Sequence, residues 1–280
     1  MIQLQHSIPG SVASDLRIDQ DFLREIVGRL AFPRPVHTPE NAKAREFIVE
    51  EFRKFHAPLV RGELKNVCAG DPQTAKILVG AHYDSVPGTP GADDNASAVA
   101  VMLAVARAVG MRPDVMFVAF NSEERGLAGS REFVDHLGEH TLEAVLVLEM
   151  VGFRDRRPDS QKNPLPFIQG IPTTGDFLGV VTNHDVLLGR ILSGANACNV
   201  PFVGLAVPDL AANMTAIESY SPHLLRSDHT PFWERGIPAA MLTDTAEFRN
   251  PNYHGAADTP DTLDFDFMAE IAKAVVHMIQ

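Results

Sequence analysis

Cysteine is scarce in this sequence, and long apolar runs are absent. The 280 residues include two cysteines, Cys68 and Cys198, which lie far apart. A disulfide scaffold needs more cysteines, and a cysteine-rich zinc site needs at least two of them close together. Both classes are therefore excluded, and we expect two buried thiols. No window approaches the roughly 20 apolar residues of a membrane span, so a membrane-spanning protein is not expected.

Basic stretches are also missing. The chain has 36 acidic and 24 basic residues and a formal charge of −12. Without a basic footprint, neither nucleic acid nor an anionic membrane is an expected partner. Residues 1–20 show no basic segment followed by an apolar one, so no signal peptide is visible. We expect a cytoplasmic protein, or a secreted or periplasmic one if a leader has been removed, and the sequence indicates no oligomeric state.

Several common catalytic motifs are not found in the sequence. It contains no G-x-S-x-G elbow, no P-loop and no H-E-x-x-H pair. A G-x-G-x-x-G fingerprint is absent too, which argues against a dinucleotide site. The chemistry of this chain must therefore be sought in other residues.

What the sequence does contain is an alternation of apolar strands and helices. Residues 76–81 and 114–120 are predicted as buried strands, with an apolar helix at 96–109 between them, which is a βαβ unit. Further strands are predicted at 143–150, 177–181, 202–207 and 239–243, and helices at 21–30, 41–55, 130–137, 186–197 and 267–278. Thr38-Pro39 is typical of a helix start. We expect one large α/β domain, with residues 153–174 forming a loop over the site.

Five short islands of acidic residues and histidines stand at the ends of apolar runs. They are residues 81–85, 91–97, 121–127, 148–152 and 252–255. Carboxylates are costly where strands end inside a fold, unless a cation neutralises them. In open α/β sheets, ligands gather at the carboxyl ends of strands, where we expect His82, Glu123, Glu124 and Glu149. Carboxylates and two imidazoles at one point predict a two-metal hydrolase, with zinc the leading candidate.

The spacing within the islands suggests separate roles. Glu123 and Glu124 are adjacent and would repel each other without a cation. If Glu124 binds metal, Glu123 is free to carry a proton during the reaction. Asp84 follows His82 closely enough to accept the second N–H of a metal-binding imidazole. One carboxylate of the pair Asp93-Asp94 is predicted to bridge two metal ions.

The second imidazole has two candidates. His254 lies beside Tyr253 in a loop rich in Gly, Pro and Asn, and His229 lies in the segment 227–232. Residue chemistry alone does not choose between them.

The islands resemble the co-catalytic di-zinc aminopeptidases, whose wider family includes glutamate carboxypeptidase, the transferrin receptor ectodomain and glutaminyl cyclase. The matching stretches are residues 80–86, 91–97, 121–130, 227–232 and 253–259. The likeness covers most of residues 34–279. It implies a single α/β/α sandwich around a mixed, mainly parallel sheet, with residues 1–280 forming one catalytic domain.

The resemblance also implies two zinc ions per chain and a set of ligands. These ligands are His82, Asp94, Glu124, Glu149 and His254. Asp94 would bridge both ions, with His82 and Glu124 completing one site and Glu149 and His254 completing the other. The choice of His254 leaves Asp228 and His229 as supporting residues.

Three further residues receive roles from the resemblance. By its position in the motifs, Glu123 resembles the family's general acid/base, and Asp84 resembles the carboxylate that hydrogen-bonds the first imidazole ligand from behind. Tyr253 resembles a phenol that helps to hold the oxyanion. The peptide bond between Asp94 and Asn95 is predicted to be cis. Glu149 departs from the pattern, because the well-known aminopeptidases have the shorter Asp there.

The implied activity is hydrolysis of the N-terminal residue of a peptide or aminoacyl substrate. A carboxypeptidase is the nearest alternative and would need a cation for the substrate carboxylate, for which Arg226 and Arg249 are candidates. A glutaminyl-cyclase-like acyltransferase would use one zinc ion. A non-enzymatic protein on this fold typically loses ligands, whereas all five positions here hold capable residues.

Overall fold

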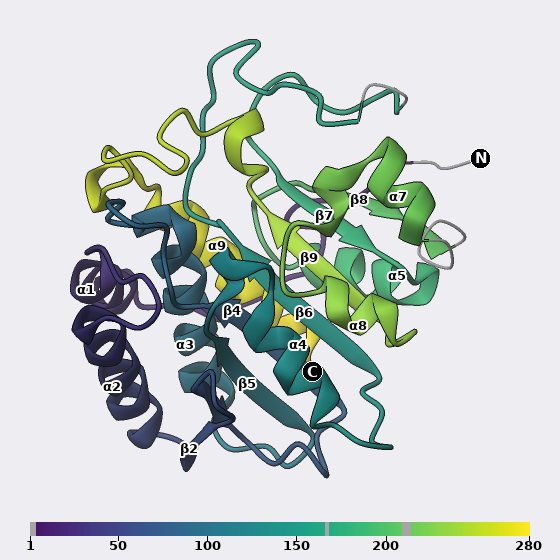
Figure 1. The fold of residues 1–280 in the computed structure, drawn as a ribbon. Helices are drawn as coiled ribbons and strands as arrows, with labels where there is room; N and C mark the ends of the chain where they lie inside the picture. The colour runs from purple at the N-terminus through teal and green to yellow at the C-terminus, as the bar shows by residue number, and fades with distance from the viewer. Residues whose placement is uncertain (1–3, 166–167, 209–213) are drawn as a thin grey trace.

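Within the part of the chain that the structure describes, nine strands form one sheet in the order β1-β8-β7-β9-β6-β4-β5-β3-β2. The computed structural model describes residues 4–165, 168–208 and 214–280 (Figure 1). The strands are β1 (Leu4–His6), β2 (Pro58–Arg61), β3 (Asn66–Ala69), β4 (Ile77–His82), β5 (Val115–Phe120), β6 (Ala144–Glu149), β7 (Leu178–Thr182), β8 (Phe202–Ala206) and β9 (Ala239–Thr243).

Parallel pairing is concentrated at the centre of the sheet. β9, β6, β4 and β5 are parallel neighbours, so their carboxyl ends meet at one edge. β7 runs antiparallel to β9 and parallel to β8, while β1, β3 and β2 pair antiparallel with their neighbours. The sheet is therefore mixed, as predicted.

Helices cover both faces of this sheet, which confirms the predicted sandwich (Figure 1). One core contains side chains from α1 (Gln20–Leu30), α2 (Pro39–Arg53), α3 (Ala98–Val109), α5 (Asp185–Ala195) and α9 (Phe265–Met278). The other contains side chains from α4 (Ala128–Asp135), α7 (Met214–Tyr220) and α8 (Thr230–Glu234). Short helical turns occur at η1 (Ala92–Ser97), η2 (Glu123–Arg125), η3 (Pro222–Leu225), η4 (Ala246–Phe248) and η5 (Pro260–Thr262).

The central elements form where the sequence predicts them because their residues are buried on every side. All residues of β4 and β5 are buried, so a continuous apolar run takes the place of an alternating pattern. In α3, Ala98 through Ala106 are all buried. At the start of α2, the Thr38 side chain accepts a hydrogen bond from the backbone of Asn41 with Pro39 in the first turn, which confirms the predicted start.

The sequence analysis does not identify the outer strands or two short helices. β1, β2 and β3 have only three to four residues, and β1 and β2 lie at the two edges, so they carry no long apolar run. α7 and α8 are also short, with seven and five residues. Cys68 and Cys198 are free and buried, as predicted. Within the described residues, no helix has the length and apolar character needed to cross a membrane, and the cytoplasmic location stays a prediction.

Candidate metal centre

The predicted ligands come from the carboxyl ends of the central parallel strands and from two loops beside them. His82 is the last residue of β4, and Glu149 is the last residue of β6. Glu124 lies in η2, directly after β5, and Asp94 lies in η1, between β4 and α3. His254 belongs to the loop that follows β9 and η4. Parallel strands deliver these side chains to one point because their carboxyl ends share one edge.

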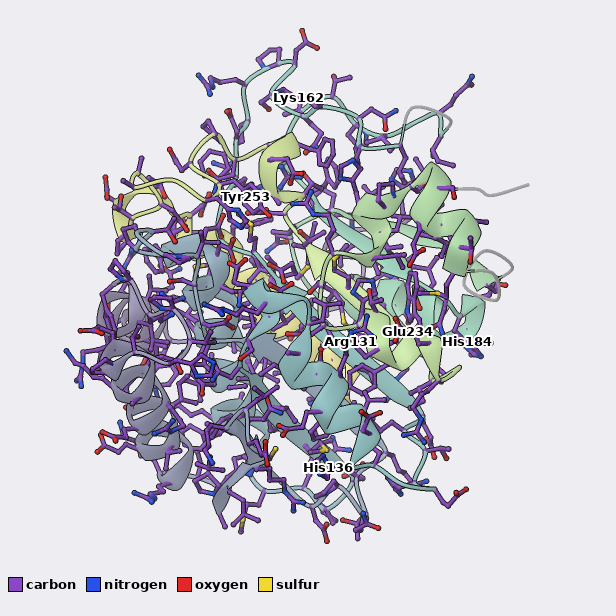
Figure 2. All side chains as sticks on the ribbon, viewed as in Figure 1. Arg131, His136, Lys162, His184, Glu234 and Tyr253 are labelled. Atoms are coloured by element: carbon purple, nitrogen blue, oxygen red, sulfur yellow. The ribbon has the colours of Figure 1, made fainter. Side chains whose placement is uncertain are left out.

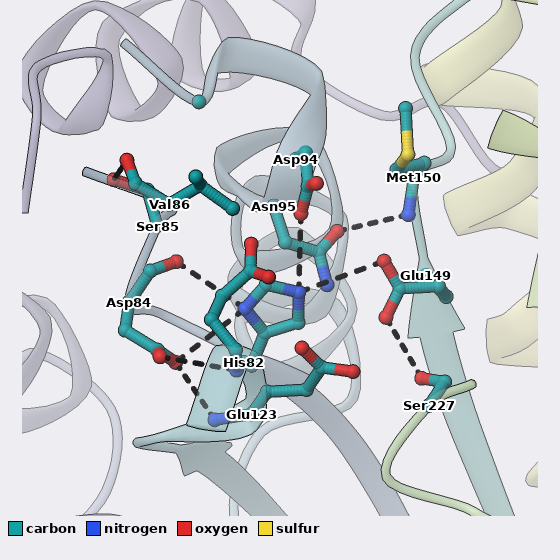
Figure 3. A network of polar contacts seen from close by, with 12 residues as sticks. His82, Asp84, Ser85, Val86, Asp94, Asn95, Glu123, Glu149, Met150 and Ser227 are labelled. Carbon is teal, nitrogen blue, oxygen red and sulfur yellow. Dashed lines mark hydrogen bonds and ion pairs between the residues drawn. The ribbon is translucent and has the colours of Figure 1, made fainter. Parts of the chain in front are cut away.

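Asp94 stands between two imidazoles. His82 Nε2 lies 3.3 Å from Asp94 Oδ1 and 3.5 Å from Glu149 Oε1 (Figure 3). On the other side, His254 Nε2 lies 3.1 Å from Asp94 Oδ2 and 3.6 Å from Glu124 Oε2. The two oxygens of one carboxylate thus face different imidazoles, which is the arrangement a bridging ligand needs.

The grouping of the ligands differs from the one that the resemblance implies. Possible ligand atoms of His82, Asp94 and Glu149 all lie within 4.8 Å of one another, as do those of Asp94, Glu124 and His254. His82 also lies within this limit of Glu123 and Glu124. His254 shares a group with Glu124 and not with Glu149, whereas the resemblance implies the pairs His82–Glu124 and Glu149–His254.

His229 is not part of these groups. Its ring is buried, its Nε2 contacts the backbone oxygen of Leu224 at 2.8 Å, and burial lowers its pKa to about 4. The structure therefore places His254 beside Asp94 and leaves His229 in the core, packed edge-on against Trp233.

Asp84 contacts the His82 ring, as predicted for a carboxylate behind a metal-binding imidazole, and also the backbone of Glu123 and Glu124. Its Oδ1 lies 3.6 Å from His82 Nδ1, and its backbone oxygen lies 3.2 Å from the same nitrogen. The carboxylate also accepts hydrogen bonds from the backbone N–H group of Glu123, at 3.1 Å (Figure 3), and from that of Glu124, at 3.3 Å. Asp84 therefore ties the His82 ring to the turn that carries both glutamates.

Asn95 is a site residue that the sequence analysis assigns no role. Its side-chain amide donates to the backbone oxygen of Leu148 at 3.1 Å. It also accepts from the N–H of Met150 at 2.9 Å (Figure 3). These two bonds hold the backbone on both sides of Glu149, while Ser227 Oγ donates to Glu149 Oε2 at 2.7 Å. The peptide bond between Asp94 and Asn95 is cis, as predicted.

Two further residues tie the loops of the site together. Asp258 accepts hydrogen bonds from the backbone N–H groups of Asp93, at 2.8 Å, and Asp94, at 3.1 Å, and so joins the His254 loop to η1. Arg34 is fully buried and donates to the backbone oxygens of Tyr83, at 2.7 Å, and Gly91, at 2.9 Å. The local sequence around Asp258 and Arg34 gives no sign that these side chains bond to the backbone of the site, since charged residues in loops are usually exposed.

The ionisable groups of the site are strongly perturbed. Burial raises the pKa of Glu123 well above its ordinary range, against the opposing charge of His82. Burial, followed by the charge of Asp94, raises the pKa of Glu124 to about 8. Burial would lower the pKa of His82, but the charges of Glu149 and Glu123 outweigh it and raise that pKa.

These groups fit a divalent cation. The site gathers carboxylates and imidazoles at short range, and Glu124 Oε1 is buried with no hydrogen-bond partner among the described residues. A buried carboxylate oxygen without a partner is costly unless a cation neutralises it. Nitrogen and oxygen donors in this combination suit zinc.

We expect the metal-free protein to lose stability as the pH rises from about 5 to 8, and bound zinc to offset the loss. The folded-state pKa of Glu124, about 8, lies above its ordinary value of 4.5, and that of Asp258, about 7, lies above 3.8. Each acid therefore stabilises the fold below its ordinary pKa, and this contribution disappears as the pH rises through the folded-state pKa. Melting temperatures of metal-free and zinc-loaded protein across this range measure the effect.

The control for this prediction is Glu124→Gln without metal, whose melting temperature should depend less on pH than that of the metal-free wild type. A metal-free wild type whose melting temperature stays level or rises over the same range would contradict the expectation.

The comparisons with known proteins show the family to which the chain belongs. The sequence profile of Peptidase family M28 matches residues 66–187 and 194–279. The uncharacterised protein YfbL of Escherichia coli (strain K12) is 34% identical over 273 residues, covering 88% of this chain and 82% of YfbL. Aminopeptidase YwaD of Bacillus subtilis (strain 168) is 49% identical over 82 residues, which are 27% of this chain and 18% of YwaD.

The fold has counterparts among solved structures. The crystal structure of the Legionella pneumophila LapA aminopeptidase superposes with a TM-score of 0.70 at 21% identity, covering 93% of this chain and 68% of LapA. At this identity, the likeness shows a shared fold.

Proposed function

Because this chain belongs to peptidase family M28, we propose that it is a zinc-dependent aminopeptidase acting on peptides whose N-terminal residue is apolar. The observation that carries the proposal is the position of Asp94 between His82 and His254, with His82 also in contact with Glu149, which lines an apolar pocket. We further propose that residues 1–280 act as a single catalytic domain, since the ligands come from the ends and loops of one sheet.

The proposed ligands divide into two sets that share Asp94. His82, Asp94 and Glu149 would hold one ion, and Asp94, Glu124 and His254 would hold the other. When bound, zinc would polarise the scissile carbonyl and lower the pKa of the attacking water.

Glu123 is the proposed proton carrier. It lies in the turn whose backbone Asp84 holds, near His82 but outside the two groups that share Asp94. Burial raises its pKa well above its ordinary range, which makes its carboxylate a stronger base. Glu123 would accept a proton from the attacking water and pass it to the departing amine.

The apolar pocket beside Glu149 and Tyr253 supports the choice of substrate. Its volume is about 120 Å³, and its walls include Phe177, Gly179, Val181, Leu205 and Met241. Residues of the irregular segment 153–174 form another wall with Pro164, Leu165 and Ile171. An apolar cavity of about 150 Å³ holds a benzene molecule, so this pocket suits one side chain of leucine size.

A carboxypeptidase is less well supported, because it needs a free cation for the substrate carboxylate. Arg249 is buried, its Nε donates to Gln161 at 2.9 Å, and it does not line the pocket. Arg226 does line the pocket, but its guanidinium is held by Glu247 and Tyr253.

Hydrolysis of leucyl and alanyl p-nitroanilides by zinc-loaded protein tests the proposal, with N-acetyl-leucyl p-nitroanilide and an acyl-leucine as controls. We expect the free leucyl substrate to be cleaved fastest and both acylated compounds to be inert. Cleavage of acyl-leucine alone would assign the carboxypeptidase activity and overturn the proposal.

In the same assay, Gly179→Leu should reverse the preference between leucyl and alanyl substrates. A Cβ atom at Gly179 would lie 3.4 Å from Thr243 O, an ordinary contact, and a longer side chain would fill the pocket. A change in hydrophobic fit of this kind alters kcat/KM by about 10–200-fold. Gly189→Leu, at an exposed position of α5, is the matched control and should change neither rate.

A further inference from the structure

Arg226 connects three residues at the rim of the apolar pocket. Its Nη2 donates a hydrogen bond to the hydroxyl oxygen of Tyr253 at 2.8 Å. Its Nη1 contacts Glu247 and lies 3.2 Å from His223 Nδ1. Arg226, Glu247 and Tyr253 line the same pocket as Glu149, so this cluster borders the proposed catalytic centre.

Tyr253 is fixed against a proposed metal ligand. Its ring stacks on the imidazole of His254, with 3.8 Å between the ring centroids and 23° between the planes. The guanidinium carbon of Arg226 lies 5.8 Å from the centroid of the phenol ring. Because His254 Nε2 also contacts Asp94, the direction of the phenol is set relative to the metal centre.

The hydrogen bond from Arg226 determines the direction in which the Tyr253 hydroxyl can donate its own hydrogen. A phenol has one hydrogen to donate and lone pairs that accept. Arg226 stays protonated and occupies a lone pair, so the hydroxyl hydrogen is directed away from the guanidinium. Among the described residues, this hydroxyl has no acceptor for its own hydrogen. The positive charge also makes the hydroxyl a better donor.

We infer that Arg226 is a positioning residue that acts through Tyr253. It holds the phenol with the O–H directed at the carbonyl oxygen of the substrate, where negative charge develops in the transition state. Glu247 holds the guanidinium through its other terminal nitrogen, Nη1. This inference rests on the proposed aminopeptidase activity and adds a residue that acts on the reacting carbonyl through Tyr253.

A double-mutant cycle with Arg226→Met and Tyr253→Phe tests the inference. Loss of one oxyanion donor lowers kcat by about 10²–10³-fold, and we expect Tyr253→Phe to reach about 10². Arg226→Met should lower kcat about tenfold with little change in KM, because a misplaced Tyr253 hydroxyl slows the chemical step without weakening the binding of the substrate. The double variant should be no slower than Tyr253→Phe alone.

Arg131→Met is the matched control. Arg131 pairs with Glu234, and its side chain is 46% exposed against 42% for Arg226. In Figure 2, Arg131 and Glu234 lie together, apart from Tyr253. This variant should leave kcat and KM unchanged.

Two kinetic outcomes would overturn the inference. Losses that multiply in the double variant would show that Arg226 acts independently of Tyr253. A rise in KM for Leu-Gly that is absent for Leu-Gly amide would assign Arg226 to the carboxylate of the substrate.

A second measurement tests the contact without turnover. The chain has three tyrosines, so protein labelled with ¹³C at the tyrosine Cζ gives few resonances, and Tyr253→Phe identifies the one that belongs to Tyr253. Arg226→Met should shift that resonance, and Arg131→Met should not; an unshifted Tyr253 resonance in Arg226→Met overturns the inference. Wild-type protein that is inactive with zinc on every leucyl substrate would sink the proposed function instead, while this resonance still reports on the contact.

Discussion

Replacing Glu123 with Gln is expected to reduce kcat by about 10²–10⁴-fold while leaving bound zinc unchanged, because proton transfer by a positioned group is worth that much. Glutamine keeps the size of the side chain and its place in the turn, whose backbone Asp84 holds. It cannot accept the proton of the attacking water, so the chemical step slows without loss of the fold.

The matched variant is Glu124→Gln, one residue further along the chain. Glu124 Oε2 lies 3.6 Å from His254 Nε2, and Glu124 belongs to the group that contains Asp94 and His254. Removing its charge should weaken metal binding directly, so that added zinc restores part of the activity. Measurements of bound zinc and kcat for both variants compare the two roles. If Glu123→Gln loses zinc and Glu124→Gln keeps it, the two roles are assigned in reverse.

Replacing Asp94 with Ala is expected to remove both ions and to lower kcat/KM by at least about 10³-fold. Metal ions stabilise transition-state charge by several kcal/mol, and each 1.4 kcal/mol is about tenfold in rate. Asp94 is the single side chain shared by the His82–Glu149 group and the Glu124–His254 group. No other substitution of one ligand should empty both positions.

His254→Ala is the comparison for this prediction. It removes one ligand from the Glu124 group and leaves His82, Asp94 and Glu149 in place. We expect about two zinc ions per chain in the wild type, about one in His254→Ala, and almost none in Asp94→Ala, by elemental analysis after dialysis. Equal zinc content in the two variants would contradict a bridging role for Asp94.

The order of the islands along the chain was sufficient to predict that their acidic and histidine side chains lie close together. β4 and β6 end in His82 and Glu149, and Glu123 and Glu124 follow β5 in η2. Because burying carboxylates is unfavourable without a counter-charge, this pattern predicts a bound cation. Residues such as Asn95 and Asp258 could not be predicted in this way. Their side chains contact backbone groups far away in sequence, at Leu148 and Met150 for Asn95 and at Asp93 and Asp94 for Asp258.

The choice of metal partners also depends on tertiary structure. In the sheet, β4 lies between β5 and β6, so His82 has a carboxylate from each neighbour within reach. The sequence does not indicate whether His82 lies closer to the carboxylate after β5 or to the one at the end of β6, because both strands are equally plausible neighbours of β4. In the folded protein, Asn95 ties Asp94 to the end of β6, which brings Glu149 to His82, while Asp84 holds the turn that presents Glu124 toward His254.

By itself, the sequence determined the residue types that can bind metal, their placement at strand ends and the α/β class, because local apolar runs and chemical character are properties of the chain. The tertiary structure decided which candidate ligands lie next to one another, the size of the apolar pocket, and the contact between Arg226 and Tyr253, which lie 27 residues apart. These features depend on distances between side chains from different elements. Such distances are set only when strand order and loop hydrogen bonds bring those elements together.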